Sequence, residues 1–235
     1  MPGYDTMLYE KHDGLAYVRL NRPERLNAFN VQMRDDLYEV MSAIRDDSDV
    51  QCVLISGEGR SFCAGADLTE FLTAPSPVRA WETRRCRDVW GLVRSLPQPL
   101  IVLLHGHVLG SGLELALFCD IRIASSDAVF GFPELGVGII PAAGGTQTLP
   151  RAIGQARALE MLLTGRWIDA KEAYNIGLIN RVVAPEELVA EAEALGADIL
   201  QCGAGLAMRV KEAVLRGVEM PLSEALVLEQ RLAFG

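Results

Sequence analysis

The chain has 235 residues, 50% of them hydrophobic, and a formal net charge of −9 at pH 7. This length allows one large domain or two small ones with a substantial core, and the negative charge argues against binding of nucleic acid. No apolar run approaches the roughly 18 residues of a membrane span, and residues 1–5 do not begin a secretory signal, so we expect a cytoplasmic protein with no membrane partner.

Short strands and helices are expected to alternate in the first half of the chain. Two apolar stretches, residues 7–9 and 15–20, flank a turn sequence at 12–14 and predict a β-hairpin. Asn30 is a favourable N-cap for the helix that follows, which carries apolar residues at helical spacing up to residue 44.

The pattern continues with buried strands that end in glycine turns. It predicts a parallel α/β sheet with right-handed crossovers, in which ligands bind at the carboxyl ends of the strands. Beyond about residue 155 we expect helices and one short strand, packed on the α/β core or on a partner subunit. The expected strands are residues 52–56, 100–104, 121–124 and 181–183, and the expected helices are residues 77–96, 113–118, 159–163, 170–174, 186–200 and 206–214.

The cysteines and histidines do not indicate a disulfide framework or a metal site. The five cysteines are odd in number and include no C-x-x-C pair, so reduced and mostly buried thiols are expected. His105 and His107 stand two residues apart on an expected strand, where they would share a face. With only three histidines in the chain, a metal-binding pair is the less favoured interpretation.

Two small-residue turns are expected to leave backbone N–H groups free. They are Ala64-Gly65-Ala66 and Gly110-Ser111-Gly112, and the second enters a helix whose N-terminus attracts negative charge. Two such N–H groups directed at one carbonyl oxygen form an oxyanion hole, although tight turns also serve packing alone. A serine hydrolase is disfavoured because Leu109 replaces the first glycine of G-x-S-x-G, and neither a complete dinucleotide fingerprint nor a P-loop occurs.

Two carboxylic acids, Glu114 and Glu134, lie in apolar stretches of the sequence. Burial is expected to raise the pKa of both, and mutual repulsion adds to this effect if the carboxyl groups are close. Such acids can transfer protons near neutral pH. A salt bridge or a helix cap is the alternative role for each glutamate taken alone.

These residues occur in motifs that resemble the crotonase superfamily, also called the enoyl-CoA hydratase/isomerase superfamily. The similarity runs through most of the chain. The motifs are residues 20–29 (LNRPERLNAF), 61–68 (SFCAGADL), 106–120, 130–134 (FGFPE), 140–147 (IPAAGGTQ), 163–165 and 170–183.

The resemblance implies an α/β fold, a crotonase-like spiral of ββα units over residues 1–185, followed by a C-terminal helical trimerisation region over residues 186–235. It also implies a homotrimer or a dimer of trimers. Relatives commonly continue into further helix that covers the acyl-CoA site. Either the helical region is short in this protein, or its last part lies beyond Gly235.

The resemblance further implies a reaction. The implied function is an enoyl-CoA hydratase of fatty acid oxidation, which adds water across the 2,3 double bond of a 2-enoyl-CoA thioester to give a 3-hydroxyacyl-CoA. Glu114 and Glu134 match the two glutamates of family hydratases, with Glu114 taking a proton from water and Glu134 giving one to C2. The N–H groups of Ala66 and Ser111 match the oxyanion hole, and Ser111 departs from the glycine of many relatives.

The CoA moiety is expected to bind along two segments that match the CoA-binding loops of the family. Arg25 is the candidate for contact with the phosphates. No metal or redox cofactor is implied, because coenzyme A enters as part of the substrate. The expected CoA-binding residues are Arg25, Ala28, Ala64, Ala66 and Asp67.

Two other functions stay open at this point. A 3,2-enoyl-CoA isomerase needs only one acid, so the second glutamate argues mildly against it. A non-catalytic acyl-CoA binding protein would keep the fold without turnover. Acyl chain length depends on side chains near residues 71–90, where Trp81 and Trp90 either line an acyl tunnel or, as we favour, pack in the core.

Overall fold

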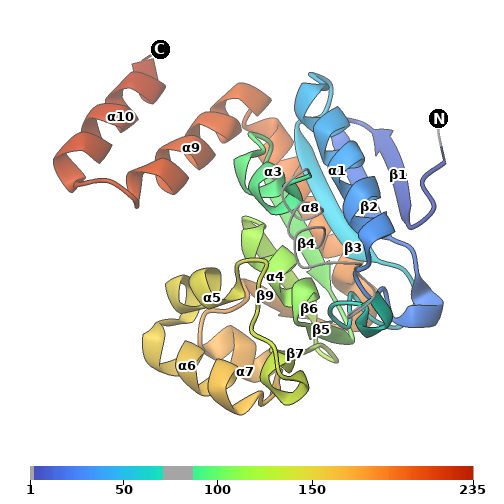
Figure 1. The fold of residues 1–235 in the computed structure, drawn as a ribbon. Helices are drawn as coiled ribbons and strands as arrows, with labels where there is room; N and C mark the ends of the chain where they lie inside the picture. Colours follow the sequence, from blue (N-terminus) through green and yellow to red (C-terminus); the bar gives the residue numbers. More distant parts are fainter. Residues whose placement is uncertain (1–2, 71–86, 235) are drawn as a thin grey trace.

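The computed structural model describes residues 3–70 and 87–234, and its centre is a six-stranded sheet with the order β1-β2-β3-β4-β6-β9 (Figure 1). The first pair of strands is antiparallel and every other neighbouring pair is parallel. Both the hairpin and the parallel sheet predicted from the sequence are therefore confirmed. The strands are β1 (Met7–His12), β2 (Leu15–Leu20), β3 (Cys52–Gly57), β4 (Leu100–Leu104), β6 (Ile121–Ser125) and β9 (Arg181–Val183).

A second, three-stranded sheet has the order β5-β7-β8, and the sequence analysis does not predict it. The expectation of a single strand after residue 155 is wrong, because β8 lies there as well as β9. Strands this short show no alternating pattern that a sequence could reveal. The strands are β5 (His107–Leu109), β7 (Val129–Gly131) and β8 (Ile168–Asp169).

Successive turns of the chain repeat one unit, with a strand in each sheet and then a helix. β4, β5 and helix α4 (Ser111–Phe118) form one such unit, and β6, β7 and helix α5 (Gly145–Ile153) form the next. A bridge between Cys63 and Val108 attaches the preceding turn to the small sheet. This arrangement is the spiral of ββα units that the resemblance implies.

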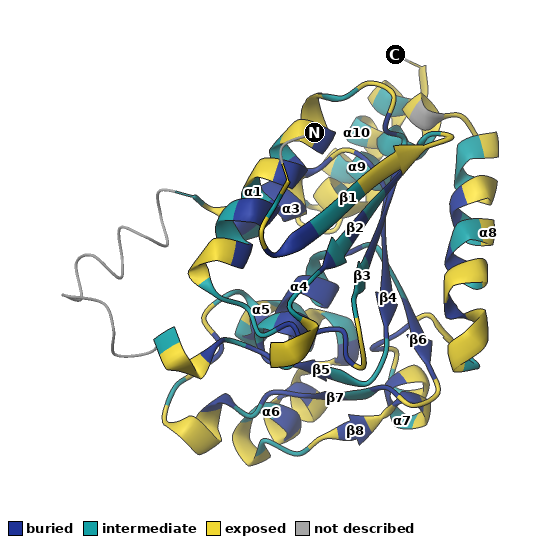
Figure 2. Ribbon diagram, turned by 90° about the vertical axis from the view of Figure 1, so that its right-hand side faces the viewer, coloured by how far each residue is buried: buried dark blue, intermediate teal, exposed yellow. Residues whose placement is uncertain are grey.

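Helices cover both faces of the large sheet, as a parallel sheet requires. Helices α1 (Val31–Asp46), α3 (Val89–Ser95) and α4 pack on one face, and α8 (Leu188–Gln201) lies along the other (Figure 2). Asn30 caps α1 as predicted, since its Oδ1 accepts a hydrogen bond from the Met33 N–H at 2.9 Å. Of the helix expected at 77–96, residues 77–86 lie outside the described residues.

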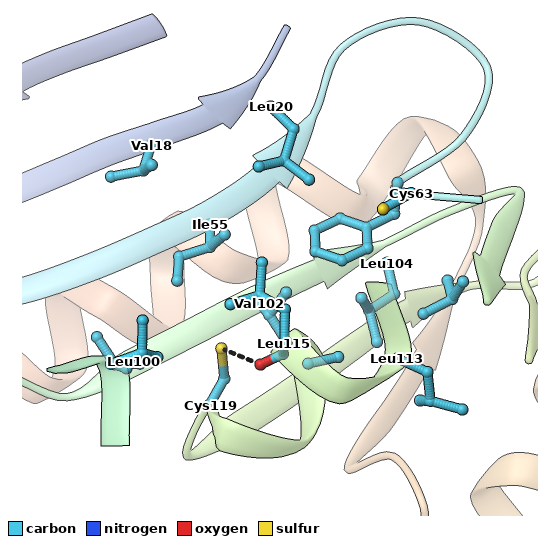
Figure 3. Close-up of a cluster of buried hydrophobic side chains, with 14 of the residues drawn as sticks. Val18, Leu20, Ile55, Cys63, Leu100, Val102, Leu104, Leu113, Leu115 and Cys119 are labelled. Atoms are coloured by element: carbon cyan, nitrogen blue, oxygen red, sulfur yellow. Dashed lines mark hydrogen bonds between the residues drawn. The ribbon is translucent and has the colours of Figure 1, made fainter. Parts of the chain in front are cut away.

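Strand β2 shows how the side chains divide between the two faces. Ala16, Val18 and Leu20 face the helices α1, α3 and α4, whereas Leu15 packs toward α8. Figure 3 shows the first of these clusters, where Leu115 of α4 lies among side chains of β2, β3 and β4. Burying one such side chain contributes roughly 1.5–3 kcal/mol, so this packing holds α4 firmly against the sheet.

The C-terminal part of the chain is helical, as expected. Its helices α6 (Gln155–Thr164), α7 (Ala170–Asn175), α9 (Ala204–Gly217) and α10 (Leu222–Phe234) follow α5, and α9 and α10 form a hairpin that extends away from the rest of the molecule (Figure 1). Helix α8 belongs to the predicted region 186–235 and packs on the sheet, so the boundary near residue 186 stays a prediction. Exposed apolar side chains are frequent on the hairpin: Leu206, Val210, Val214, Leu215, Val218, Leu222, Leu226, Val227 and Phe234.

The two histidines expected on one strand lie on different segments. Gly106 turns the chain between them with φ +54°, and a Cβ at this position would lie 2.2 Å from the Arg60 carbonyl oxygen. His105 Nε2 therefore contacts the Gly59 carbonyl oxygen at 3.0 Å, while His107 belongs to β5. Within residues 3–70 and 87–234, no three His, Cys, Asp or Glu side chains gather as metal ligands would.

The thiols follow the prediction where they can be compared. Cys52, Cys63 and Cys119 are buried and free, and Cys202 is free and exposed. Cys86 lies outside the described residues. Every helix in the described part of the chain is too short or too polar to cross a lipid bilayer.

Candidate active site

The turn between β5 and α4 brings three separate loops together. Gly110 adopts φ +49° and ψ −122°, a conformation that favours glycine, and its N–H donates to the Gly131 carbonyl at 3.0 Å. A Cβ on Gly110 would lie 2.7 Å from Glu134 Oε1 and 3.5 Å from the Cα of Gly65. Helix α4 then begins at Ser111, two residues earlier than predicted.

The second turn, around Gly65, lies beside the first. The Phe29 N–H donates to the Gly65 carbonyl at 2.8 Å, and the Asp67 N–H donates to the Phe29 carbonyl at 3.0 Å. In an extended segment bonded this way, the N–H of the intervening residue, Ala66, points to the opposite side. Within the described residues, neither the Ala66 N–H nor the Ser111 N–H donates to a protein acceptor. Two free N–H groups therefore sit on adjoining turns.

Glu114 is almost fully buried, with 1% of its surface exposed. Its Oε1 accepts hydrogen bonds from the Ala143 N–H and the Gly145 N–H, both at 2.8 Å. Burial raises the pKa of Glu114, and these two amides and the Ser111 hydroxyl oppose that rise. The two amide donors are not among the residues predicted from the sequence, although a Gly-Gly pair before a helix is a signal for such an anion-binding N-terminus.

Glu134 begins a short 3₁₀ helix, η3 (Glu134–Val137), and is 9% exposed. Its Oε2 is buried and has no hydrogen-bond partner within the described residues. Burial, followed by the negative charge of Glu114, raises the pKa of Glu134 to about 7. The structure thus places both predicted glutamates near the two turns in unlike environments. Glu114 has donors that stabilise its anion, whereas no donor in the described part of the chain reaches Glu134 Oε2.

The segments expected to bind CoA also lie side by side. The Ala64 N–H donates to the Leu26 carbonyl at 3.0 Å, which places residues 26–28 against residues 64–67. Arg25 is exposed on the 3₁₀ helix η1 (Pro23–Arg25), so its side chain is accessible. Asp67 is buried and its carboxylate binds protein donors.

Two polar residues that hold these segments are absent from the sequence-based site. Asn27 is fully buried with φ +54°, its Oδ1 accepts from the Arg22 N–H at 2.8 Å, and its Nδ2 donates to the carbonyls of Glu58 and Ser61. Arg22 forms an ion pair with Asp67 at 3.0 Å. Neither residue has a sequence signal beyond its place in the LNRPERLNAF motif.

Only some of the side chains expected near the acyl chain lie within the described residues. Residues 71–86, which include Trp81, lie outside the described residues. The ring of Trp90 lies 5.1 Å from that of Phe29 and 6.1 Å from that of Phe118. Trp90 is half-buried against the main core, in line with the favoured packing role.

Comparison with known proteins gives one consistent family. Residues 10–234 match the family described as Enoyl-CoA hydratase/isomerase. The crotonyl-CoA hydratase of Syntrophomonas wolfei is 40% identical over 235 residues, which is 99% of this chain and 89% of that protein. Enoyl-CoA hydratase from Bacillus anthracis has a TM-score of 0.92 and 33% identity, over 97% of this chain and 90% of that one.

A protein solved in complex with CoA is also similar. That protein, from Thermobifida fusca YX, has a TM-score of 0.90 and 33% identity, over 97% of this chain and 91% of that one. The fold, the matching motifs and these similarities agree over nearly the whole length of the chain. The chain belongs to the enoyl-CoA hydratase/isomerase family.

Proposed function

We propose that the protein is a 2-enoyl-CoA hydratase, which adds water across the 2,3 double bond of an enoyl-CoA thioester to give a 3-hydroxyacyl-CoA. The observation that carries this proposal is the unequal environment of the two glutamates. Two amides hold the anion of Glu114, whereas Glu134 has a pKa of about 7 and a buried Oε2 without a partner. A carboxyl group whose anion two amides stabilise, beside one whose pKa is raised to about 7, is the pair that addition of water requires.

The two free amides would stabilise the charge that develops on the substrate. As water attacks C3, electrons of the double bond move onto the thioester oxygen. The N–H groups of Ala66 and Ser111 would donate to this oxygen, and the N-terminus of α4 adds its positive potential. Loss of one such donor typically costs about 2.7–4 kcal/mol of transition-state stabilisation.

The proton transfers follow from the two environments. Glu114 takes a proton from water as the water oxygen bonds to C3, and the resulting enolate takes a proton from Glu134 at C2. The product leaves Glu114 protonated and Glu134 ionised, so one proton must then return from Glu114 to Glu134. The negative charge of Glu114 raises the pKa of Glu134, which indicates that the two carboxyl groups are near enough to interact.

The proposal extends to substrate binding and assembly. CoA would lie along the adjoining segments that contain Ala28, Ala64, Ala66 and Asp67, with Arg25 near its phosphates. The proposed reaction uses no further cofactor, since this chain supplies both proton-transfer groups and the hydrogen bonds, and the added atoms come from water. We place the protein in fatty acid oxidation in the cytoplasm, as a homotrimer or a dimer of trimers joined through the helical hairpin α9–α10.

The test is turnover of crotonyl-CoA, followed by loss of the absorbance of the conjugated thioester. Glu134→Gln should lower kcat by about 10²–10⁴-fold, because it removes the proton donor, while CoA binding changes little. Glu186→Gln, a change at an exposed glutamate, is the control. Wild-type protein that binds CoA without consuming crotonyl-CoA would rule out the hydratase. Conversion of a 3-enoyl-CoA to the 2-enoyl isomer without hydration would establish the isomerase instead.

A further inference from the structure

Arg22 joins the two segments proposed to bind CoA. Its side chain is 16% exposed, and both terminal nitrogens lie 3.0 Å from Asp67 Oδ2. Nη1 also donates to the Ala28 carbonyl at 2.5 Å. One guanidinium therefore connects residue 28 with the residue that directly follows Ala66.

The carboxylate of Asp67 is held from its other side as well. Its Oδ1 accepts from the Thr69 hydroxyl at 2.7 Å and from the Thr69 N–H at 3.1 Å. The Thr69 hydroxyl, and after it the Thr69 amide and Arg22, hold the pKa of Asp67 below its usual range. Because the Asp67 N–H also donates to Phe29, residue 67 is fixed by both its side chain and its backbone.

Fixing residue 67 fixes the direction of the Ala66 N–H. Ala66 lies between Gly65 and Asp67, whose backbone groups both bond to Phe29 and so direct the Ala66 N–H away from that strand. Gly65 has φ +105°, and a glycine has few steric limits on its backbone. The peptide between residues 65 and 66 could therefore rotate if residue 67 were not held in place. The ion pair between Arg22 and Asp67 opposes that rotation.

We propose that Arg22 and Asp67 are positioning residues of the oxyanion hole, and that their ion pair keeps the Ala66 N–H directed at the thioester oxygen. This inference rests on the proposed function. Both oxygens of Asp67 already bind protein donors, so Asp67 acts on the substrate through the Ala66 amide rather than through its carboxylate. The ion pair supplies no charge to the reaction, because Arg22 and Asp67 both bind groups within the protein.

The kinetic test separates positioning from CoA binding. Arg22→Gln and Asp67→Asn should each lower kcat for crotonyl-CoA by about 10- to 100-fold, because a displacement of about 1 Å can cost roughly 10²-fold. The Kd of CoA alone should change by less than about 2-fold, because CoA lacks the thioester oxygen. Arg22→Lys should recover part of the loss, since an ammonium still reaches one partner. Arg181→Gln, which removes an ion pair with Glu191, is the control.

A spectroscopic test reports the oxyanion hole directly. The probe is 4-(dimethylamino)cinnamoyl-CoA, whose absorbance moves to longer wavelength when its thioester oxygen accepts strong hydrogen bonds. Wild-type protein and Arg181→Gln should show this shift in full, and Arg22→Gln and Asp67→Asn should show a smaller one. The double variant should lose no more than about 2-fold beyond either single variant, because both changes break one contact.

The outcomes distinguish this inference from the proposed function. If wild-type protein binds the probe without a shift, the oxyanion hole itself is wrong. If wild-type shows the shift and Asp67→Asn keeps both the shift and kcat, the positioning role is wrong. A loss confined to the Kd of CoA also overturns it, since the pair would then support the CoA segment. Should Arg22→Gln fail to fold, Asp67→Asn, which preserves side-chain size, gives the same readouts.

Discussion

Glu134 is a residue whose negative charge the fold disfavours. The pKa of its carboxyl group is about 7 in the folded protein, against an ordinary value of 4.5, because the group is buried and faces the charge of Glu114. The folded state therefore binds the Glu134 proton more tightly than the unfolded state does. The stability that this proton contributes is fully present below about pH 4.5 and is lost as the pH rises through about 7.

Stability measurements can isolate this effect. Between pH 5 and pH 8 the wild-type protein should lose on the order of 2–3 kcal/mol of unfolding free energy relative to Glu134→Gln, which cannot ionise. Urea unfolding of both proteins at several pH values measures the difference. Glu186→Gln, a change at an exposed glutamate, should follow the wild-type curve. If the wild-type and Glu134→Gln curves stay parallel, the carboxyl group is not protonated near neutral pH.

The same titration should appear in the rate of hydration. As the proposed proton donor, Glu134 must be protonated, so kcat/KM for hydration should fall as the pH rises above about 7. Steady-state rates from pH 5.5 to 9 give the profile, and its apparent pKa belongs to the interacting pair of glutamates. A profile that is flat across this range would contradict the proton-donor role.

The sequence indicates the two glutamates but not the groups that hold them. Glu114 and Glu134 are recognisable because an acidic side chain in an apolar stretch is costly without a role. The amides of Ala143 and Gly145 are indicated only by the Gly-Gly pair at the start of α5, since every residue except proline has an N–H. Arg22 looks in the sequence like a surface arginine, and only the folded chain brings it to Asp67.

At the scale of elements, the β5–α4 turn depends on a glycine. Gly110→Ala would place a Cβ 2.7 Å from Glu134 Oε1 in a backbone conformation that costs an L-residue about 1–3 kcal/mol. We expect kcat to fall by more than about 10-fold and the melting temperature to fall by several degrees. The control Gly3→Ala, where a Cβ meets open space, should not lower either value. If Gly110→Ala kept wild-type activity, the β5–α4 turn would not be needed to position Glu134.

The elements that are predictable from sequence are those with a long apolar pattern. Strands β3 and β4 are recognisable as continuous apolar runs, and helices α1 and α8 carry their buried residues at helical spacing. The small sheet has strands of two or three residues, which no period can reveal, although β5 and β7 direct the chain into the site. Contacts between distant segments, rather than local preference, form this sheet.

At the scale of the whole molecule, the hairpin α9–α10 exposes apolar side chains that the proposed trimer would cover. No described side chain on either helix is buried, and an open hollow of about 350 Å³ lies between them, lined by residues that include Met220 and Val227. Large exposed apolar patches are common at sites of protein–protein interaction. This agrees with the proposed trimer.

Sedimentation or light scattering should give a mass of about 77 kDa, three times the 25.6 kDa of one chain, or twice that for a dimer of trimers. A variant carrying Val210→Glu and Val214→Glu on α9 should dissociate toward the monomer, because charges at an interface core are costly. The control is Val189→Glu on α8, since all three valines are 56% exposed. A wild-type monomer would contradict the trimer.

The two amides that hold Glu114 come 29 and 31 residues after it in the chain, and they belong to the next unit of the spiral. No single repeat can therefore make a working catalyst. While the ribosome is still adding the residues around 145, the nascent polypeptide already contains both acids, yet the two amides that bind Glu114 in the folded protein are not in place. Fragments that end before this point should consequently remain inert toward thioesters.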